Sequence, residues 1–307
     1  MQLDSLEKVE RQYLRKLLGL LRDSTVAGLF TETGIIPCAA KRIIGAVGFV
    51  AALLQLPDGL PAKHALFHSV AMAAAGQASF YSKFLMRLAH WNVQLGPLKE
   101  LDQKRVSHIA REIVQVEFQR LHCQIEACPK STMLVRQSWK RSKPRAYLAI
   151  PNYKHRQALV RLLFSQSALA DELGRYDQQY AHPDERWCRL CSLRGTYHLE
   201  NGLELIFACP HPAITALRRI MVSHSGEVWR TYGTPIERLQ EMLDDAQASR
   251  SLAAFVYRAN AIIRAERWER TDWHEEPCSD EEALLTDSDE DECQEDEWLP
   301  AVNSQAV

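Results

Sequence analysis

Cysteine is scarce in this chain, and long apolar runs are missing. Eight cysteines in 307 residues are too few for a disulfide scaffold, and the pair Cys188/Cys191 is typical of proteins in a reducing compartment. The longest apolar run, residues 43–56, is interrupted by Gln55 and falls short of the roughly 20 residues that span a bilayer. No secretory signal follows Met1. We therefore predict an intracellular protein without a membrane partner, and the nucleus is a compatible compartment.

Motifs that carry catalysis are absent as well. The sequence contains no G-x-S-x-G nucleophile elbow, no H-E-x-x-H zinc motif, no P-loop and no G-x-G-x-x-G fingerprint. Its histidines are scattered, without an acid or a nucleophile at a spacing that indicates a catalytic pair. Asp244 and Asp245 are adjacent, but they lie in a helical pattern and indicate a solvated helix face. We predict that this chain is not an enzyme.

Acidic residues are concentrated at one end of the chain. Fourteen of the 39 Asp and Glu residues lie after Arg270, where there is no Lys or Arg. The first 270 residues therefore carry 25 acids against 37 bases, an excess of 12 positive charges. A basic body is typical of proteins that bind a polyanion such as nucleic acid. The acidic tail, residues 271–307, is too charged and too poor in apolar residues to fold alone, so we expect it to be disordered.

Apolar periodicity indicates a mainly α-helical fold. In residues 1–128, apolar side chains recur every three or four positions, and no alternating β-type run interrupts them. The first helix is expected to carry Val9, Tyr13 and Leu17 on its apolar face. Farther along, Thr234-Pro235-Ile236-Glu237 is a capping box with proline at the first helical position, which predicts a helix start.

We predict four parts from these patterns. The first is a helical bundle, and the second is a basic linker followed by a helix. The third is a small cysteine-containing, knuckle-like module with C-terminal helices, and the fourth is the disordered acidic tail. Their boundaries are residues 1–128, 129–180, 181–270 and 271–307.

A 44-residue stretch without any acid gives the strongest functional signal. Residues 127–170 contain nine Lys and Arg residues and several aromatic residues. Basic side chains neutralise phosphates, and aromatic rings stack on unpaired bases. A solvated basic face that balances the acidic tail would give the same pattern. The predicted nucleic-acid contacts are Lys140, Arg141, Lys143, Arg145, Lys154, Arg156, Arg161, Trp139, Tyr147 and Tyr153.

The cysteines of the third part suggest a metal site. Cys188-Arg-Leu-Cys191 is a C-x2-C pair, a common half of a tetrahedral zinc site, and Cys209 can supply a third thiolate. A small apolar cluster with free thiols is the alternative. We predict a structural zinc ion rather than a catalytic one. The fourth ligand stays open between His198, Glu204 and His211.

Several short segments share their order and spacing with one family of proteins. They are residues 6–19, 29–37, 73–76, 147–151, 155–163 and 169–172, the C-x2-C pair, Cys209-Pro210, Thr234-Pro235 and residues 253–257. Together they resemble the C-terminal, post-polymerase region of fungal LINE-type (non-LTR) retrotransposon reverse transcriptases. The resemblance extends over nearly the whole chain up to about Arg264.

The resemblance implies a nucleic-acid-handling module that helps to grip template RNA and target DNA during target-primed reverse transcription. Catalysis would belong to an upstream polymerase domain, a partner of this region, and to a separate endonuclease. Two positions depart from the family, since Glu204 and Ser167 stand where histidines are expected. We predict a non-catalytic nucleic-acid-binding fragment. The alternatives are a helical protein-interaction module and a degenerate, non-functional remnant of such an element.

Overall fold

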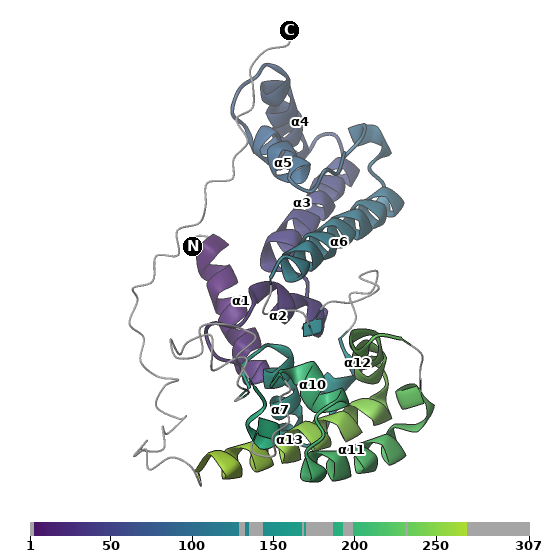
Figure 1. Ribbon diagram of the computed structural model, residues 1–307. Coiled ribbons are helices and arrows are strands. Elements are labelled where there is room, and N and C mark those ends of the chain that lie inside the picture. The colour runs from purple at the N-terminus through teal and green to yellow at the C-terminus, as the bar shows by residue number, and fades with distance from the viewer. Residues whose placement is uncertain are drawn as a thin grey trace. The chain divides into compact units, whose positions relative to one another are not determined.

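The computed structural model of the protein is mainly helical, as the periodicity predicted. It describes residues 3–128, 133–134, 144–167, 169, 187–192, 199–230 and 233–268 (Figure 1). The chain divides into two compact units, Met1–Glu269 and Arg270–Val307. The predicted disordered tail therefore falls in the second unit, which lies outside the described residues.

The part of the first unit before residue 128 consists of helices joined by short turns. The predicted turn at residues 57–59 separates two of them. These helices are α1 (Leu3–Leu18), α2 (Val26–Thr33), α3 (Cys38–Gln55), α4 (Pro61–Ala74), α5 (Phe80–Ala89), the 3-10 helix η1 (Leu98–Glu100) and α6 (Gln103–Glu126).

Local sequence signals explain where several of these helices begin. α3 begins directly after Pro37, and α4 has Pro61 at its first position, where a missing N–H costs nothing because the first turn has no acceptor for it. The side chain of Ser79 accepts a backbone hydrogen bond in a capping box at the start of α5. Asp102 does the same at the start of α6.

The rest of the first unit is also helical, and it contains the predicted site residues. The capping box at Thr234 is confirmed, since its hydroxyl accepts from the backbone N–H of Glu237 and the Glu237 carboxylate accepts from the N–H of Thr234. The elements are η3 (Ala146–Ala149), α7 (Tyr153–Leu163), α9 (Arg189–Ser192), α10 (Gly202–Phe207), α11 (Pro212–Ser225), η6 (Gly226–Arg230), α12 (Pro235–Asp244) and α13 (Ala246–Trp268).

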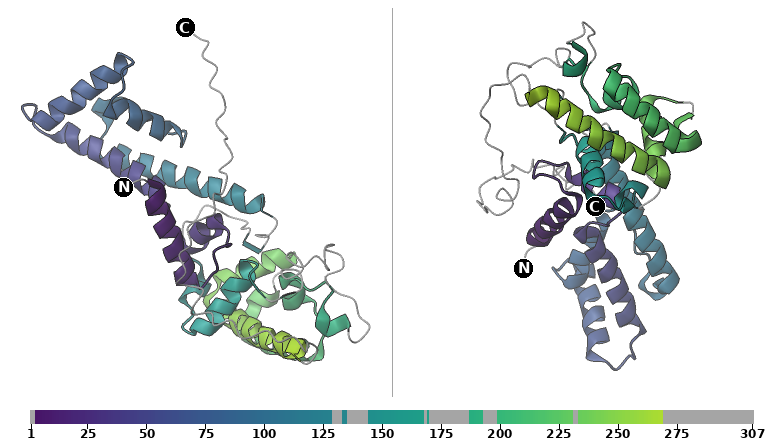
Figure 2. Two further views of the ribbon diagram at one scale, coloured as in Figure 1. Left: turned by 90° about the vertical axis from the view of Figure 1, so that its left-hand side faces the viewer. Right: turned by 90° about the horizontal axis from the view of Figure 1, so that it is seen from below.

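Two clusters of buried apolar side chains hold the unit together. One lies among α3 to α6, and the other joins α1 and α2 to α7 and to α10 through α13. α6 contributes Ile109 and Ile113 to the first cluster, and Phe118 and Leu121 to the second. α7 and α11 both pack against α13, which is visible from two directions (Figure 2). The boundary predicted at residue 128 therefore does not separate two cores.

The first helix buries a different face from the one predicted. Leu14 and Leu18 are buried, whereas Val9 and Tyr13 are 61% and 62% exposed and Leu17 is 48% exposed. The prediction for α1 was wrong because apolar residues lie on two neighbouring faces, and the face with Leu14 and Leu18 packs into the cluster that α2 and α7 share. An apolar stripe of α1 is left at the surface.

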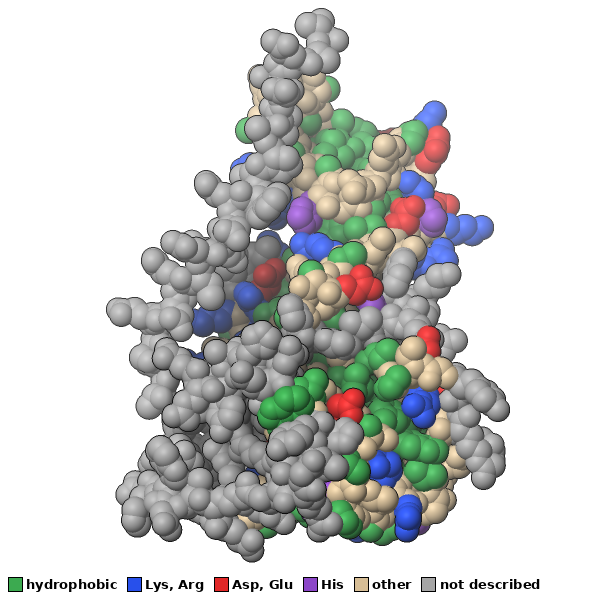
Figure 3. All heavy atoms as spheres, in the orientation of Figure 1, with side chains coloured by type: hydrophobic (Ala, Val, Ile, Leu, Met, Phe, Trp, Pro, Cys, Tyr) green, Lys and Arg blue, Asp and Glu red, His purple; other side chains and the backbone are tan. Residues whose placement is uncertain are grey.

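α3 is apolar from Ile43 to Leu54. By length and composition it could cross a membrane, with a mean hydropathy of 1.5, and 28% of it is buried; a core helix of a soluble protein meets the same criteria. Ile43, Val47 and Val50 lie in the core, whereas Phe49 is exposed and makes an edge-to-face contact with Phe80. Hydrophobic side chains are visible on the upper half of the face drawn in Figure 3, which contains α3 and α5.

Candidate metal centre and nucleic-acid interface

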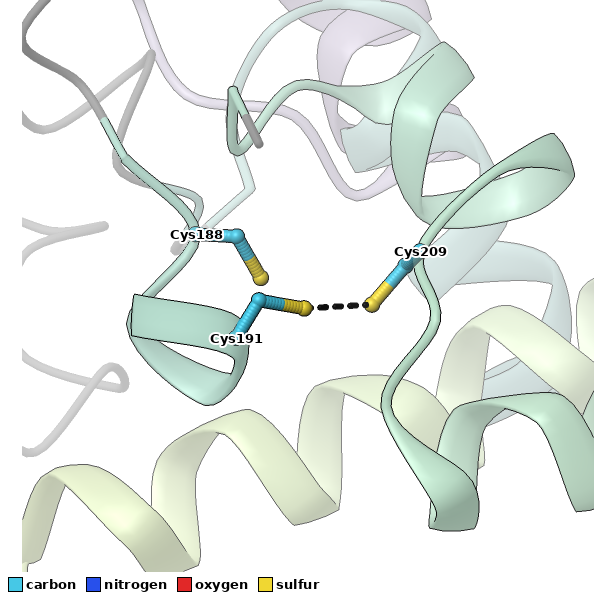
Figure 4. A group of neighbouring side chains, drawn as sticks. All are labelled: Cys188, Cys191 and Cys209. Atoms are coloured by element: carbon cyan, nitrogen blue, oxygen red, sulfur yellow. Dashed lines mark hydrogen bonds between the residues drawn. The ribbon is translucent and has the colours of Figure 1, made fainter. Parts of the chain in front are cut away.

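Three buried cysteines form one cluster. Cys188 precedes the single turn of α9, Cys191 lies within that turn, and Cys209 follows α10. Their sulfur atoms all lie within 4.8 Å of one another, and the Sγ atoms of Cys191 and Cys209 are 3.6 Å apart. Figure 4 shows the three side chains pointing toward one another beside α13. The structure thus brings together the three cysteines predicted from the sequence.

The spacing of these thiols fits a tetrahedral metal ion. A zinc–sulfur bond of about 2.3 Å in tetrahedral geometry places two sulfurs about 3.8 Å apart, close to the 3.6 Å between Cys191 and Cys209. A small cavity of about 10 Å³ borders Cys188, Cys209 and the buried carboxylate of Glu200. That volume holds about one water-sized occupant. Three thiolates are a donor set that zinc prefers, so the group can hold a structural metal ion.

Hydrogen bonds and burial shift the pKa values of the three thiols in different directions. The pKa of Cys188 is raised by its hydrogen bond with Cys209 and by burial. Burial raises the pKa of Cys191, whereas the hydrogen bond with Cys188 lowers the pKa of Cys209. The backbone of His211 donates to the sulfurs of Cys191 and Cys209, which favours their ionised forms. Metal binding would displace the protons of the thiols, because zinc binds the thiolate form.

Glu204, one of the three candidates for the fourth ligand, does not lie with the three thiols in this structure. Its carboxylate does not belong to the group whose ligand atoms lie within 4.8 Å. α10 instead turns the backbone carbonyl of Glu204 toward Cys209, whose N–H donates to it at 2.7 Å. The ring of His211 does not join the group either, and His198 lies outside the described residues. Sequence reasoning missed Glu200, which lines the cavity; a lone acid beside the predicted His198 gave only a weak signal.

Two of the predicted nucleic-acid contacts are buried. Arg145 is 3% exposed and Tyr147 is fully buried. The Arg145 Nη1 atom donates to Asp244 at 2.8 Å, and its Nε lies 3.5 Å from Glu32. The hydroxyl of Tyr147 also donates to Glu32, at 2.7 Å. Neither side chain is open to a nucleic acid in this structure, because carboxylates distant in the sequence pair with Arg145 and accept the hydrogen bond of Tyr147.

The structure describes four of the remaining predicted nucleic-acid contacts, which lie on α7. The α7 residues Lys154 and Tyr153 are exposed, and Arg156 is half-buried. Arg161 is also half-buried, and its Nε donates to the carbonyl of Gly19 at the end of α1. Four predicted residues lie outside the described part: Trp139, Lys140, Arg141 and Lys143.

The start of α7 meets α13 in a group of basic and aromatic side chains. The rings of His155 and Tyr257 lie 5.0 Å apart, and the Arg156 guanidinium lies 5.5 Å from the centre of the Tyr153 ring. Burial and then the charge of Arg258 lower the pKa of His155. We call this group the basic cluster, and its members are Tyr153, Lys154, His155, Arg156, Tyr257 and Arg258.

The basic cluster has no acidic neighbour among the described side chains. None of its cations lies within 4.0 Å of a described carboxylate. Neither α7 nor residues 246–265 of α13 contain an Asp or Glu. Tyr153 and Tyr257 are 48% and 39% exposed. Sequence reasoning missed Tyr257 and Arg258, although the acid-free run in α13 could have indicated them.

No protein-family model matches this sequence, and comparison with curated proteins and with solved structures gives no significant match. The functional assignment therefore depends on the two groups of residues described above.

Proposed function

We propose that this chain is a non-catalytic nucleic-acid-binding segment that grips an RNA template or target DNA, as the post-polymerase region of a non-LTR retrotransposon reverse transcriptase would. The observation that carries the proposal is the basic cluster, in which cations and half-exposed tyrosines lie together and no described carboxylate lies within 4.0 Å of a cation. Such a surface attracts phosphates.

The position of the cluster at the start of α7 strengthens this electrostatic argument. Asn152 caps the helix, and Lys154, His155 and Arg156 occupy its first turn. The N-terminal end of a helix already carries partial positive charge. Cations there therefore destabilise the helix and make the local electrostatic potential more positive. A phosphate group would relieve that repulsion and accept hydrogen bonds from the same side chains.

Tyrosine rings complete the proposed interface. Tyr153 lies beside the Arg156 guanidinium, and Tyr257 lies beside His155 on the neighbouring helix. Both rings are partly exposed. Bases of a single strand stack on such rings whatever their sequence, so we expect binding with little sequence preference.

The salt dependence of binding tests the proposal. In the triple variant Lys154→Gln, Arg156→Gln, Arg258→Gln, we expect weaker binding of an RNA oligonucleotide. The slope of log affinity against log salt should fall by about 2 to 3, since each lost phosphate contact removes roughly 0.7 to 0.9. Fluorescence anisotropy between 50 and 200 mM salt measures both quantities.

A matched variant on another helix controls for the loss of charge. Lys104→Gln, Arg111→Gln changes two exposed cations of α6. We expect this variant to retain wild-type affinity and salt slope. Equal affinity in the triple variant, or an equal loss in the α6 variant, would contradict the proposed interface.

We further propose that Cys188, Cys191 and Cys209 hold a zinc ion that staples α9 to the end of α10. The support is their mutual spacing and burial next to α13. Bound zinc would cross-link the short helices α9 and α10 and stabilise the fold around them, because the binding free energy of a structural zinc ion contributes directly to folding. It would therefore position the residues around the cysteines rather than take part in a reaction.

Metal analysis tests this second part. Protein purified with added zinc should contain about one ion per chain, and Cys209→Ser should lose it, whereas Cys123→Ser, at an exposed cysteine of α6, should not. A zinc ratio near zero in the wild-type protein would remove the metal site. The fourth ligand is identified by comparing His198→Ala, Glu200→Gln and Glu204→Gln.

The apolar stripe of α1 favours an additional partner. Val9, Tyr13 and Leu17 are exposed along one face of this helix, and exposed apolar patches commonly mark protein contacts. In the proposed setting that partner is the upstream polymerase domain.

In the alternative, a helical protein-interaction module, the stripe would be the main binding surface and RNA would be a poor ligand at any salt concentration. A degenerate remnant would bind neither.

A further inference from the structure

A pocket on α11 lies outside the metal site and the basic cluster. Its volume is about 320 Å³, and its walls come from α11 and η6. Gly226, at φ 61°, makes the turn between these two elements in a backbone conformation that favours glycine. Basic and hydrophobic side chains are interspersed over α11 on the face drawn in Figure 3. The lining residues are Thr215, Arg218, Arg219, Val222, Ser223 and Trp229.

The aromatic wall of the pocket is held in place by a stack of side chains. Trp229 stacks on Phe207, with ring centroids 5.3 Å apart and planes 21° apart. The guanidinium of Arg238 lies 4.9 Å from the centre of the Phe207 ring. Phe207 therefore supports the indole of Trp229, which packs partly against the core and also lines the pocket. A rigid, half-buried indole is a good platform for another flat ring.

The polar wall of the pocket suits an anion. Arg218 is fixed by donating to the carbonyls of Ile206 and Cys209, each at 2.8 Å. Arg219 is exposed and makes no ion pair with a described carboxylate. The described residues that line the pocket include no acid. The hydroxyls of Thr215 and Ser223 lie on the same helix face as the two arginines, because residues three, four and seven apart align on a helix.

A flat aromatic wall beside two guanidinium groups selects a ligand that is both planar and anionic. A nucleotide has these properties together, since its base stacks on aromatic rings and its phosphate binds arginine. A base inside a duplex is already stacked between its neighbours, so only an unpaired base can lay its ring on Trp229. We infer that this pocket receives one unpaired nucleotide of a single strand, with the base against Trp229 and the phosphate at Arg219. The inference rests on the proposed nucleic-acid-binding function.

Comparing the affinity for single-stranded and duplex oligonucleotides of the same sequence distinguishes binding in this pocket from general electrostatic attraction. In Trp229→Leu we expect single-strand affinity to fall about 5- to 150-fold, the range for losing one stacked base. Duplex affinity should stay unchanged, because a paired base cannot enter the pocket. Arg219→Gln should weaken single-strand binding and lower its salt slope by about 1.

Two further variants keep the result interpretable. Trp229→Phe preserves an aromatic wall and should retain most of the single-strand affinity, and Arg111→Gln on α6 removes an exposed arginine elsewhere and should change nothing. If Trp229→Leu and Arg219→Gln bind the single strand as the wild-type protein does, the pocket is not a nucleotide site and the proposed function stands. A wild-type preference for duplex also overturns the inference. If the wild-type protein binds neither form, the proposed function and this inference both fail.

Discussion

At the scale of single residues, Arg145 lies at the centre of a buried polar network. Its backbone N–H donates to the carbonyl of Glu32, and its guanidinium bonds to Asp244 and Gln240. Burial alone would lower the pKa of Arg145, but the carboxylates of Glu32 and Asp244 outweigh it and the pKa is raised. The guanidinium is therefore charged at all working pH values. It ties α2 to η3 and α12 rather than meeting a phosphate.

Removing this guanidinium should destabilise the fold strongly. In Arg145→Met the buried carboxylate of Glu32 loses its counter-ion, and breaking a buried pair from one side costs about 3 to 5 kcal/mol. Most of that loss comes from Glu32, because the side chain of Asp244 is 67% exposed and solvent screens it. Urea unfolding followed by circular dichroism measures the change in free energy of unfolding.

Two other variants distinguish this ion pair from general packing. Tyr147→Phe removes only the hydroxyl bond to Glu32 and should cost about 1 to 2 kcal/mol. The double variant Glu32→Gln, Arg145→Met should cost less than the sum of the single changes, because neither charge is then left alone. A loss below about 1 kcal/mol in Arg145→Met would contradict the network described here.

This residue also marks where sequence reasoning reached its limit. Arg145 and Tyr147 were predicted as nucleic-acid contacts because no acid lies near them in the sequence. Their partners are 99 residues away at Asp244 and 115 residues away at Glu32. Charge patterning along a chain detects only local neighbours, so it cannot separate an open cation from one that a distant carboxylate neutralises. The cysteine cluster was predictable because C-x2-C spacing itself constrains two ligands.

At the scale of elements, α7 begins with a residue that stabilises the helix, but its first turn carries charges that destabilise it. Asn152 accepts the backbone N–H of His155 and caps the helix. Lys154 and Arg156 then lie in the first turn, where cations oppose the helix dipole. A sequence selected for stability alone would place acids at these positions. We infer that function accounts for the cations, since no described carboxylate pairs with them.

Lys154→Glu should therefore change stability and binding in opposite directions. Replacing a cation by an anion in the first turn of α7 should stabilise the protein by about 0.5 to 1 kcal/mol. The same change should weaken RNA binding, because it removes one phosphate contact and adds repulsion. Thermal unfolding and fluorescence anisotropy give the two values. Parallel changes in both would mean that Lys154 acts on folding and not on the ligand.

The elements themselves were largely predictable, but the buried face of α1 was not. Pro61, Thr234 and the proline after it carry local signals that fix where helices begin, and the structure follows them. In α1, by contrast, Leu14 and Leu18 are buried while Leu17 is exposed. Apolar residues lie on two neighbouring faces of this helix, and packing against distant parts of the chain decides which face is buried.

At the scale of the whole molecule, charge is split between the two compact units. The residues before 271 carry an excess of 12 positive charges, and residues 271–307 carry 14 acids without a base. Opposite charges on one chain attract each other at a high effective concentration set by the connecting segment. An acidic tail can therefore compete with RNA for the basic cluster, and the attraction should be screened over about 10 Å at 0.1 M salt.

Deleting residues 271–307 should accordingly strengthen RNA binding at 50 mM salt, and the gain should shrink toward 200 mM as screening increases. A full-length variant in which the tail acids are changed to Gln and Asn should behave like the deletion, because charge and not chain length is the cause. Anisotropy titrations of the three proteins at both salt concentrations make the comparison.

If deletion changes nothing while the wild-type protein binds RNA, the tail does not compete for the basic cluster. If RNA stays a poor ligand with and without the tail, the proposed nucleic-acid binding fails, and a binding assay on the exposed stripe of α1 then separates a protein-interaction module from a degenerate remnant.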